Sequence, residues 1–304
     1  MPTDMSNLNL FISPAPLFGG YQKEFKDAEY IVFGVPFDAT STYRSGARFA
    51  PTAIREASLN IETYSFRSGI DLEDLKIHDA GDLHTSMNAG ETLRRVEAVC
   101  RDILKEDKMP VIIGGEHTIT FGAAKSIKGD LTIVSFDAHL DLRDEYMGER
   151  LSHTTFLRRI NEEMEPKRIM VIGARAACRE ELRYVSESEN IRYITSQKIL
   201  HEGIEGALRD IKDFLYDRDR LYITVDMDVL DPSFAPAVQN PEPEGISLTM
   251  LLDILLEICD DRLAIFDLVE VTPHYDNGIT AAAAAKIIFE TLMHHHKVIE
   301  RRRE

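Results

Sequence analysis

The chain has 304 residues, of which 44% are hydrophobic, so it can bury a large core as one α/β domain or as two smaller ones. Lys and Arg total 35 against 52 Asp and Glu, which gives a formal net charge of −17. This balance argues against a nucleic-acid partner, because phosphate binding needs a basic face. It is compatible with a cationic substrate, although an acidic surface also serves solubility alone.

No segment has the pattern of a signal peptide or of a membrane span. The N-terminus lacks a charged start followed by a long apolar stretch, and no apolar run is long enough to cross a bilayer. The cysteines Cys100, Cys178 and Cys259 are widely spaced and odd in number, which is typical of buried, reduced thiols. We therefore expect a soluble, cytoplasmic protein with no membrane partner.

Apolar runs typical of strands alternate with segments of helical periodicity. Strands are expected at 30–35, 110–113, 131–136, 168–172, 191–194, 221–225 and 263–269, and helices at 51–58, 90–106, 204–216, 248–259 and 280–296. Pro51 is tolerated in a first helical turn, and Ser247 can cap the helix that starts at Leu248. The alternation predicts an α/β fold with a mainly parallel sheet covered on both faces. A single domain over residues 1–304 is the simplest arrangement.

Charged side chains follow four of the predicted strands, where open α/β sheets bind ligands. The run that ends at Phe136 is followed by Asp137, His139 and Asp141, which share one side if the chain stays extended. The other three strand ends lead into Gly114-Gly115-Glu116-His117, into Asp226-Met227-Asp228 and into Glu270. We expect all of these groups to meet at one edge of the sheet.

Six of these residues are potential metal ligands, namely His117, Asp137, His139, Asp141, Asp226 and Asp228. A single catalytic zinc uses about three protein ligands, so six favour a pair of divalent ions roughly 3.5–4 Å apart. The oxygen-rich set favours Mn²⁺. Taken alone, Asp226 and Asp228 could be turn formers and His117 a core histidine. Three uncompensated ionisable groups at the end of a buried strand, however, would be costly.

The motifs resemble those of the ureohydrolase family, which contains the arginases and agmatinases, over about Ile31 to Glu290. The three metal motifs correspond to Gly114–His117, Ser135–Asp141 and Thr224–Pro232, and the N-terminal loop and helix to Gly34–Asp38, Gly46–Pro51 and Ile54-Arg55. The resemblance implies a three-layer α/β/α sandwich, with residues 1–28 as an N-terminal extension and 297–304 as a charged tail. It also implies a homo-oligomer, either a trimer or a hexamer.

The resemblance also implies two Mn²⁺ ions per subunit. One would be held by His117, Asp137, Asp141 and Asp226, and the second by Asp137, His139, Asp226 and Asp228. Asp137 and Asp226 would then bridge the pair. Such ions make hydroxide available near neutral pH for attack on a guanidinium carbon.

Three residues are expected to act on the substrate. Asp141 would pass a proton to the leaving nitrogen, and Glu270 would pair with the planar guanidinium through two hydrogen bonds. His153 matches the position of the family's proton-shuttling histidine, and an imidazole titrates near working pH. A structural ion pair is the alternative role for Glu270, and an exposed loop histidine is the alternative for His153.

The loop Leu142–Arg150 looks like the agmatinase pattern, so the predicted reaction is hydrolysis of agmatine to putrescine and urea. An acidic wall from Asp144, Glu145 or Glu149 would suit the cationic tail of this small guanidino substrate. Ala237–Asn240 departs from the Gly/Thr-rich stretch of agmatinases, which makes N1-aminopropylagmatine a competitor, followed by arginine and guanidinobutyrate. A non-catalytic metal-binding regulatory subunit is the alternative from another class, and a mononuclear deacetylase of related fold is a further one.

The remaining histidines have no ligand pattern. His294, His295 and His296 end the last predicted helix and, with Arg301–Arg303, are expected to form a solvated terminus. His274 lies just past Glu270 and could line the mouth of a pocket, although a surface role is favoured.

Overall fold

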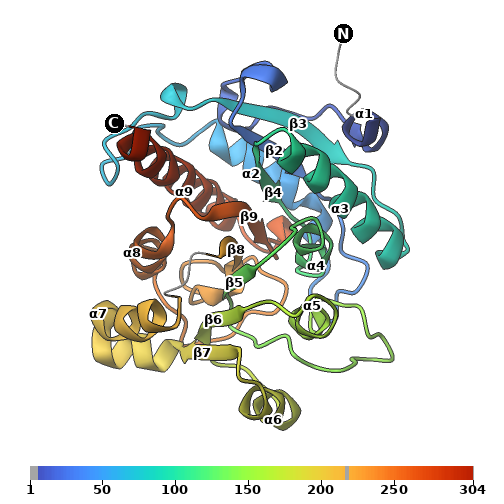
Figure 1. Ribbon diagram of the computed structural model, residues 1–304, viewed down its shortest axis with the longest axis vertical. Coiled ribbons are helices and arrows are strands. Elements are labelled where there is room, and N and C mark those ends of the chain that lie inside the picture. The colour runs from blue at the N-terminus through green and yellow to red at the C-terminus, as the bar shows by residue number, and fades with distance from the viewer. Residues whose placement is uncertain (1–5, 216–218, 304) are drawn as a thin grey trace.

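The computed structural model describes residues 6–215 and 219–303, which contain one nine-stranded sheet (Figure 1). The strand order is β1-β3-β2-β4-β9-β8-β5-β6-β7. All pairs are parallel except β1 with β3. The strands are β1 (Ile12–Ser13), β2 (Tyr30–Gly34), β3 (Ile77–Leu83), β4 (Met109–Ile113), β5 (Leu131–Phe136), β6 (Arg168–Ala174), β7 (Ile191–Thr195), β8 (Arg220–Asp226) and β9 (Leu263–Val269).

Helices cover both faces of this sheet, as expected for an α/β/α sandwich. One face packs against α2 (Ala50–Ser58), α7 (Ser196–Phe214), α8 (Leu248–Ile258) and α9 (Ile279–Arg303). The other packs against α1 (Ser6–Phe11), α3 (Ala89–Lys105), α4 (Ile119–Ala124), α5 (Phe156–Met164) and α6 (Arg179–Glu187). The predicted mainly parallel sheet is confirmed. No helix in the described ranges is both long and apolar enough to traverse a bilayer.

The seven predicted strands are all present, with ends that differ by at most two residues. The sequence pattern missed β3, whose Ile-His-Asp-Ala-Gly-Asp-Leu run alternates buried and half-buried positions and carries three polar residues. Two of these, Asp79 and Asp82, accept hydrogen bonds from the fully buried guanidinium of Arg55 on α2. The polar residues of β3 therefore bind a helix. Because of them, the strand lacks the apolar run by which the other strands were predicted.

The predicted helices differ from the structure mainly in their ends. Helix α7 starts at Ser196 and continues through a non-helical Gly203 (φ 77°), so the expected start at Ile204 marks only its second half. The expected end at Tyr216 lies outside the described residues. Helix α9 runs to Arg303, and His295 and His296 within it are buried, so the predicted solvated terminus at these residues is wrong.

The N-terminal segment is integrated into the core. Strand β1 pairs with β3, and the fully buried Phe18 packs edge-on against Phe289 of α9, with ring centroids 5.2 Å apart. The described part of residues 1–28 thus contributes to the sheet and to one of its packed faces.

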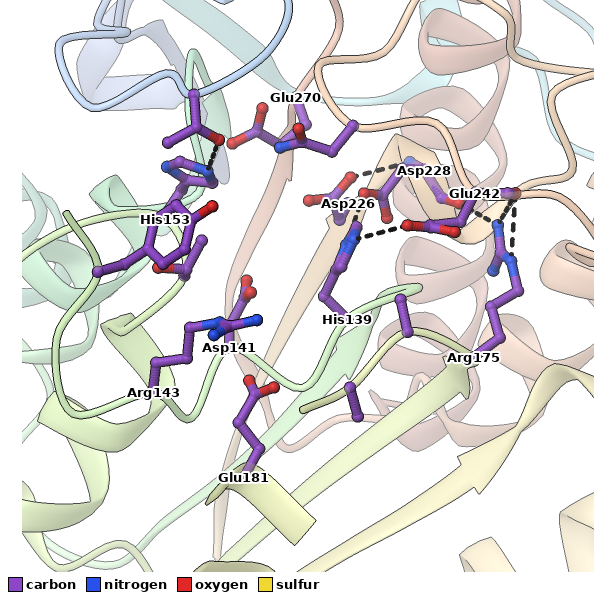
Figure 2. A pocket seen from close by; sticks show the side chains of 16 residues that line it. His139, Asp141, Arg143, His153, Arg175, Glu181, Asp226, Asp228, Glu242 and Glu270 are labelled. Atoms are coloured by element: carbon purple, nitrogen blue, oxygen red, sulfur yellow. Dashed lines mark hydrogen bonds and ion pairs between the residues drawn. The ribbon is translucent and has the colours of Figure 1, made fainter. Parts of the chain in front are cut away.

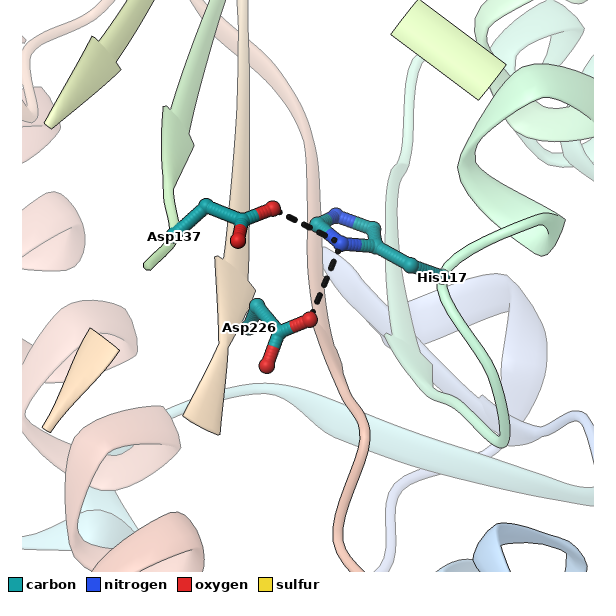
Figure 3. A group of neighbouring side chains, drawn as sticks. All are labelled: His117, Asp137 and Asp226. Atoms are coloured by element: carbon teal, nitrogen blue, oxygen red, sulfur yellow. Dashed lines mark hydrogen bonds and ion pairs between the residues drawn. The ribbon is translucent and has the colours of Figure 1, made fainter. Parts of the chain in front are cut away.

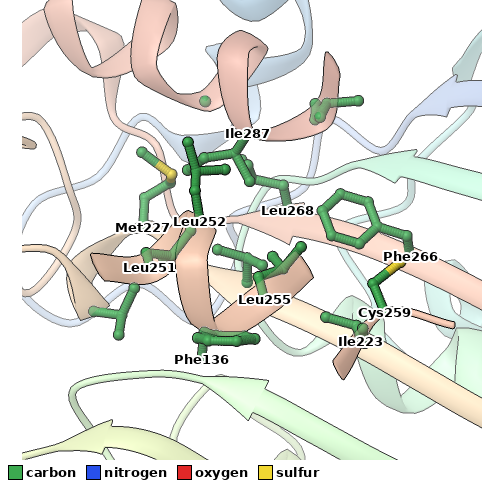
Figure 4. Close-up of a cluster of buried hydrophobic side chains, with 14 of the residues drawn as sticks. Phe136, Ile223, Met227, Leu251, Leu252, Leu255, Cys259, Phe266, Leu268 and Ile287 are labelled. Atoms are coloured by element: carbon green, nitrogen blue, oxygen red, sulfur yellow. The ribbon is translucent and has the colours of Figure 1, made fainter. Parts of the chain in front are cut away.

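Helix α8 shows how a covering helix is held on the sheet (Figure 4). Its Leu251, Leu252 and Leu255 are buried among Phe266 and Leu268 of β9 and side chains of the neighbouring strands. Each fully buried leucine of this kind contributes about 1.5–3 kcal/mol relative to an exposed one. This packing fixes β8 and β9, the strands that carry part of the site described below.

Gly115, in the turn after β4, is a point of close backbone approach. A Cβ atom there would lie 1.9 Å from the carbonyl oxygen of Phe37 and 2.7 Å from its nitrogen. These contacts are with backbone, so no side-chain rotation can relieve them. The turn from β4 therefore requires glycine at this position.

Gly115→Ala should lower the free energy of unfolding by at least about 2 kcal/mol, because either the turn or the 37–38 backbone must shift. Chemical denaturation measures this loss. Gly90→Ala is the control, since its Cβ would meet nothing closer than Oδ1 of Asn88 at 3.3 Å and alanine favours the helix. Equal stabilities for the two variants would contradict the claim that the turn after β4 requires glycine at position 115.

Candidate active site

Four adjacent strands of the sheet, β4, β9, β8 and β5, deliver the predicted polar residues to one edge. His117 follows β4, Glu270 follows β9 directly, and Asp226 is the last residue of β8 with Asp228 just beyond it. Asp137, His139 and Asp141 follow β5. All six predicted metal ligands and Glu270 therefore converge at the carboxyl ends of neighbouring strands, as expected.

The first cluster is centred on Nδ1 of His117 (Figure 3). This nitrogen lies 3.1 Å from Oδ2 of Asp226, 3.2 Å from Oδ2 of Asp137 and 3.6 Å from Oδ2 of Asp141. The imidazole of His117 is fully buried and packs against the ring of Phe156 with ring centroids 4.1 Å apart.

The second cluster shares Asp137 with the first. Nδ1 of His139 lies 3.0 Å from Oδ2 of Asp228 and 3.6 Å from Oδ1 of Asp137. The backbone N–H of Ala138 donates to Oδ1 of Asp228 over 3.1 Å, and the N–H of Asp228 donates to Oδ1 of Asp226 over 2.8 Å. Backbone hydrogen bonds thus fix the carboxylates while leaving other oxygens directed at the cluster.

The electrostatics of the clusters fit divalent cations. Burial and repulsion from neighbouring carboxylates raise the pKa values of Asp141 and Asp226 well above their usual range. Although burial opposes it, contact with Asp137 and Asp141 raises the pKa of His117 to about 9. The raised pKa values mean that protons on these groups partly neutralise the clustered negative charge. Metal ions would neutralise it instead, since buried carboxylates are normally paired or bound to metal. The donor set of four carboxylates and two imidazoles suits a binuclear site.

Two residues at this edge have backbone conformations that non-glycine residues rarely adopt. Asp141 has φ 50° and Glu270 has φ 69°, both in the left-handed region. Such residues persist where surrounding structure holds them, and they cluster at functional sites. In both cases the unusual backbone turns a carboxylate toward the cavity (Figure 2).

A cavity of about 430 Å³ opens beside the two clusters. Its wall contains His139, Asp141, Asp226, Asp228 and Glu270, together with His153 on the loop that follows β5 (Figure 2). His153 and Glu270 are only 4% and 3% exposed, so neither is a surface residue. The cavity thus brings the three predicted catalytic side chains next to the metal ligands.

Thr40 and Glu116 hold His153 and were not predicted from the sequence. The Thr40 hydroxyl donates to Oε1 of the buried Glu116 over 2.7 Å, so it must accept from Nδ1–H of His153 at 3.0 Å. This leaves Nε2 of His153 as the nitrogen with a free lone pair, 3.4 Å from the Thr42 hydroxyl. Burial lowers the pKa of His153 to about 4, so the ring is neutral at pH 7.

Arg175 was also missed, although it follows β6 just as the predicted residues follow their strands. Its guanidinium donates to the carbonyl oxygens of Asp228 (2.6 Å), Glu242 (2.8 Å) and Pro243 (2.9 Å). It therefore ties the loop after β8, which carries Asp228, to the segment 237–245 that borders the cavity. Applying the strand-end rule to β6 would have identified it.

The expected acidic wall from the loop 142–150 is wrong. Asp144 lies in an ion-pair cluster with Arg150 and Arg159, and Glu145 is not among the residues that line the cavity. Glu149 lines a neighbouring hollow. The acids that line the cavity beyond the metal ligands and Glu270 are Glu181 and Glu242.

The cysteines and His274 do not contribute to this cavity. Cys100 and Cys259 are buried free thiols, as expected, whereas Cys178 is half-buried. His274 packs on the ring of Phe49 with centroids 4.8 Å apart, outside the cavity lining.

The sequence of residues 28–294 matches the model of a protein family described as the arginase family. The chain belongs to this family. It is accordingly a hydrolase of the ureohydrolase type with a binuclear metal site, which confirms the family resemblance of the sequence motifs.

Several relatives cover almost the whole chain. The agmatinase of Bacillus subtilis is 37% identical over 284 residues, 91% of this chain and 95% of its own. The N(1)-aminopropylagmatine ureohydrolase of Thermococcus kodakarensis is 33% identical over 276 residues, 88% and 91% of the two chains. The crystal structure of the agmatine ureohydrolase of Thermoplasma volcanium superposes with a TM-score of 0.85 at 36% identity, covering 92% of this chain and 94% of that one.

Metal binding by the metal-free protein should tighten as the pH rises from about 6.5 to 9, because the metal must displace the proton that a pKa of about 9 keeps on His117. The same raised pKa stabilises the metal-free fold below pH 6.5 and ceases to do so as the pH rises through about 9. Calorimetric Mn²⁺ titrations in buffers of different ionisation enthalpy measure the released protons. An affinity independent of pH, without proton release, would contradict this electrostatic account.

Arg175→Lys should lower the free energy of unfolding by roughly 2 kcal/mol, since an ammonium cannot reach the same set of carbonyl oxygens. Urea denaturation of the metal-free protein checks this. Arg94→Lys is the matched control, because Arg94 pairs with Glu91 on the exposed face of α3, where such pairs contribute little. A loss no larger than that of the control would show that Arg175 does not tie the two loops together.

Proposed function

We propose that the chain hydrolyses agmatine to putrescine and urea. The observation that carries this proposal is Glu270, a buried carboxylate at the cavity wall beside the two metal clusters. Its Oε1 accepts the backbone N–H of His117 over 2.6 Å. Its Oε2 is buried and accepts no hydrogen bond from the described residues, so it is available to a guanidinium in the cavity.

Glu270 would hold the guanidinium in the orientation that attack requires. A planar guanidinium presents paired N–H donors to a carboxylate, and such charge-assisted pairs fix geometry as well as adding affinity. Burial raises the pKa of Glu270 well above its usual range, and the cationic substrate would favour the ionised form. The structural ion pair considered as its alternative role has no support, since the described residues offer it no Lys or Arg partner within ion-pair distance.

His117, Asp137, Asp141 and Asp226 would hold one divalent ion, and Asp137, His139, Asp226 and Asp228 would hold the second. When bound, such a pair would supply a hydroxide nucleophile at neutral pH. Asp141 lies at the cavity wall, where it can accept a proton and deliver it to the leaving nitrogen. Nε2 of His153 can accept a second proton, because Thr40 occupies its Nδ1–H. A non-catalytic metal-binding subunit would need neither Glu270 nor this arrangement of His153.

A second candidate substrate is suggested by the residues that would surround the substrate's tail. Glu242 and Glu181 line the cavity and suit the free amine of agmatine or aminopropylagmatine. Both oxygens of Glu181, however, already accept backbone N–H groups, from Leu142 and Cys178. Arg143 also lines the cavity, stacked over the Tyr146 ring at 5.0 Å, and its cation favours a carboxylate-bearing tail such as that of guanidinobutyrate.

Urea release with Mn²⁺ from agmatine, aminopropylagmatine, arginine and 4-guanidinobutyrate tests the proposal. We expect the highest kcat/KM for agmatine, and Arg143→Gln should raise it further by removing a like charge. No urea from any of the four would sink the proposed activity. A preference for guanidinobutyrate that Arg143→Gln abolishes would replace agmatine with the second candidate.

Glu270→Gln should reduce kcat/KM on the order of 10²-fold, because a neutral amide no longer matches both donors of the guanidinium. Its Mn²⁺ content should stay unchanged. Glu290→Gln is the control, since this buried glutamate binds Ser65 and Lys286 away from the cavity. A similar loss in both variants would indicate damage to the fold rather than a role in substrate binding.

His153→Asn should lower kcat on the order of 10²-fold, which is typical for loss of a group that transfers protons. Thr40→Val should lower kcat in the same direction and by less, because His153 remains but loses the acceptor that fixes its tautomer. Thr42→Val, which removes the longer 3.4 Å contact to Nε2 of His153 and leaves the Thr40 contact in place, serves as the comparison. Steady-state kinetics with full metal occupancy would refute the shuttle role if His153→Asn kept wild-type kcat.

A further inference from the structure

One further buried carboxylate, Asp267 in β9, lies behind the first metal cluster and has no part in the reaction described above. It is fully buried in the sheet, where a charged group is costly unless it is paired or hydrogen-bonded. Its Oδ2 accepts hydrogen bonds from the Tyr222 hydroxyl of β8 and, over 2.8 Å, from the Thr120 hydroxyl of α4. Asp267 is thus surrounded by hydroxyl donors from two elements.

Thr224 connects this carboxylate to the metal ligand His117. The two strands place Thr224 directly beside Asp267, as cross-strand partners in the parallel pair β8–β9. The Thr224 oxygen lies 2.9 Å from Nε2 of His117 and 3.4 Å from the Thr120 oxygen. A continuous row of polar atoms therefore runs from His117 through Thr224 and Thr120 to Asp267, entirely within the buried core.

The direction of these hydrogen bonds follows from counting protons. A threonine hydroxyl has one proton to donate, and an ionised carboxylate can only accept. Because Thr120 donates its only proton to Asp267, Thr224 is the donor in the 3.4 Å contact between the two threonine oxygens. The lone pairs of the Thr224 oxygen are then left to accept from Nε2–H of His117.

We propose that Asp267 is a positioning residue that, through Thr120 and Thr224, holds His117 with its proton on Nε2 and its Nδ1 lone pair directed at the metal cluster. A metal ligand of this kind needs a deprotonated nitrogen, and the hydrogen bond made by the other ring nitrogen decides which one is free. If the row ran the other way, Thr224 would donate to Nε2, and the proton would reside on Nδ1, where it would block the metal.

Two substitutions interrupt the row without changing its shape. Asp267→Asn replaces an acceptor by an amide that can donate towards Thr120 and so reverse the row. Thr224→Val removes the acceptor for His117, whereas Thr224→Ser keeps the hydroxyl. Tyr222→Phe removes another donor to the same Asp267 oxygen but leaves the row to His117 complete, so it controls for damage to the core.

Mn²⁺ affinity of the metal-free, full-length chain, measured from the EPR signal of free Mn²⁺, is the readout. Thr224→Val and Asp267→Asn should each weaken binding about 10- to 100-fold, as loss of an outer partner of a ligand typically does. The double variant should bind no more weakly than the weaker single, because both changes break one row. Thr224→Ser and Tyr222→Phe should stay within about threefold of the wild type.

The proposal fails if Asp267→Asn binds Mn²⁺ like the wild type, or if the two losses multiply in the double variant. It also fails if Tyr222→Phe loses as much affinity as Asp267→Asn. If Asp267→Asn does not fold, Thr120→Val replaces it in the double variant with Thr224→Val, because it breaks the row between Thr224 and Asp267. Wild-type affinity in Thr120→Val would then refute the role of the carboxylate.

Discussion

The structure depends on one constraint, which is that four carboxylates and two imidazoles must be held together at the edge of a sheet with little exposure to water. Like charges so close destabilise one another unless protons or cations intervene. In the metal-free chain, burial and this repulsion raise the pKa values of Asp141 and Asp226, and the same carboxylates raise that of His117. Two divalent ions would relieve it, and the rest of the fold keeps these groups in place for them.

The surroundings of the site do this in four separate ways. Adjacent parallel strands bring the ligands to one edge, and backbone N–H groups fix the carboxylates of Asp226 and Asp228. The guanidinium of Arg175 fastens the loop after β8 to the cavity-lining segment 237–245. Glu116 and Thr40 hold His153 through hydrogen bonds in the same way.

Much of this was predictable from the sequence, because parallel strands are buried on both faces and leave continuous apolar runs. The seven strands and all six ligand positions follow from those runs and from the charges that end them. Strand β3 was not predictable in this way, because Asp79 and Asp82, which accept hydrogen bonds from Arg55, interrupt its apolar run. The orientation of side chains on the loop after β5 was not predictable either. Asp144 turns to arginines on its outer side, whereas Arg143 turns into the cavity.

This distinction between strand-end and loop residues also separates the residues for the reaction from those for substrate preference. Metal ligands and Glu270 are placed by strand ends, so their geometry follows from the sheet. Glu242 and Arg143, which would meet the substrate's tail in the proposed function, lie instead on loops whose path depends on long-range hydrogen bonds. The strand-end residues therefore identify the family, whereas the preference for one substrate tail would depend on such loop residues.

The two clusters share Asp137, and in the proposed function Asp137 and Asp226 would bridge a pair of metal ions. Anomalous diffraction at the manganese edge, from crystals of the Mn²⁺-loaded protein, tests it most directly. We predict two peaks about 3.5–4 Å apart, one beside Nδ1 of His117 and the other beside Nδ1 of His139. A single peak, or two peaks with no bridging carboxylate between them, would contradict the central claim.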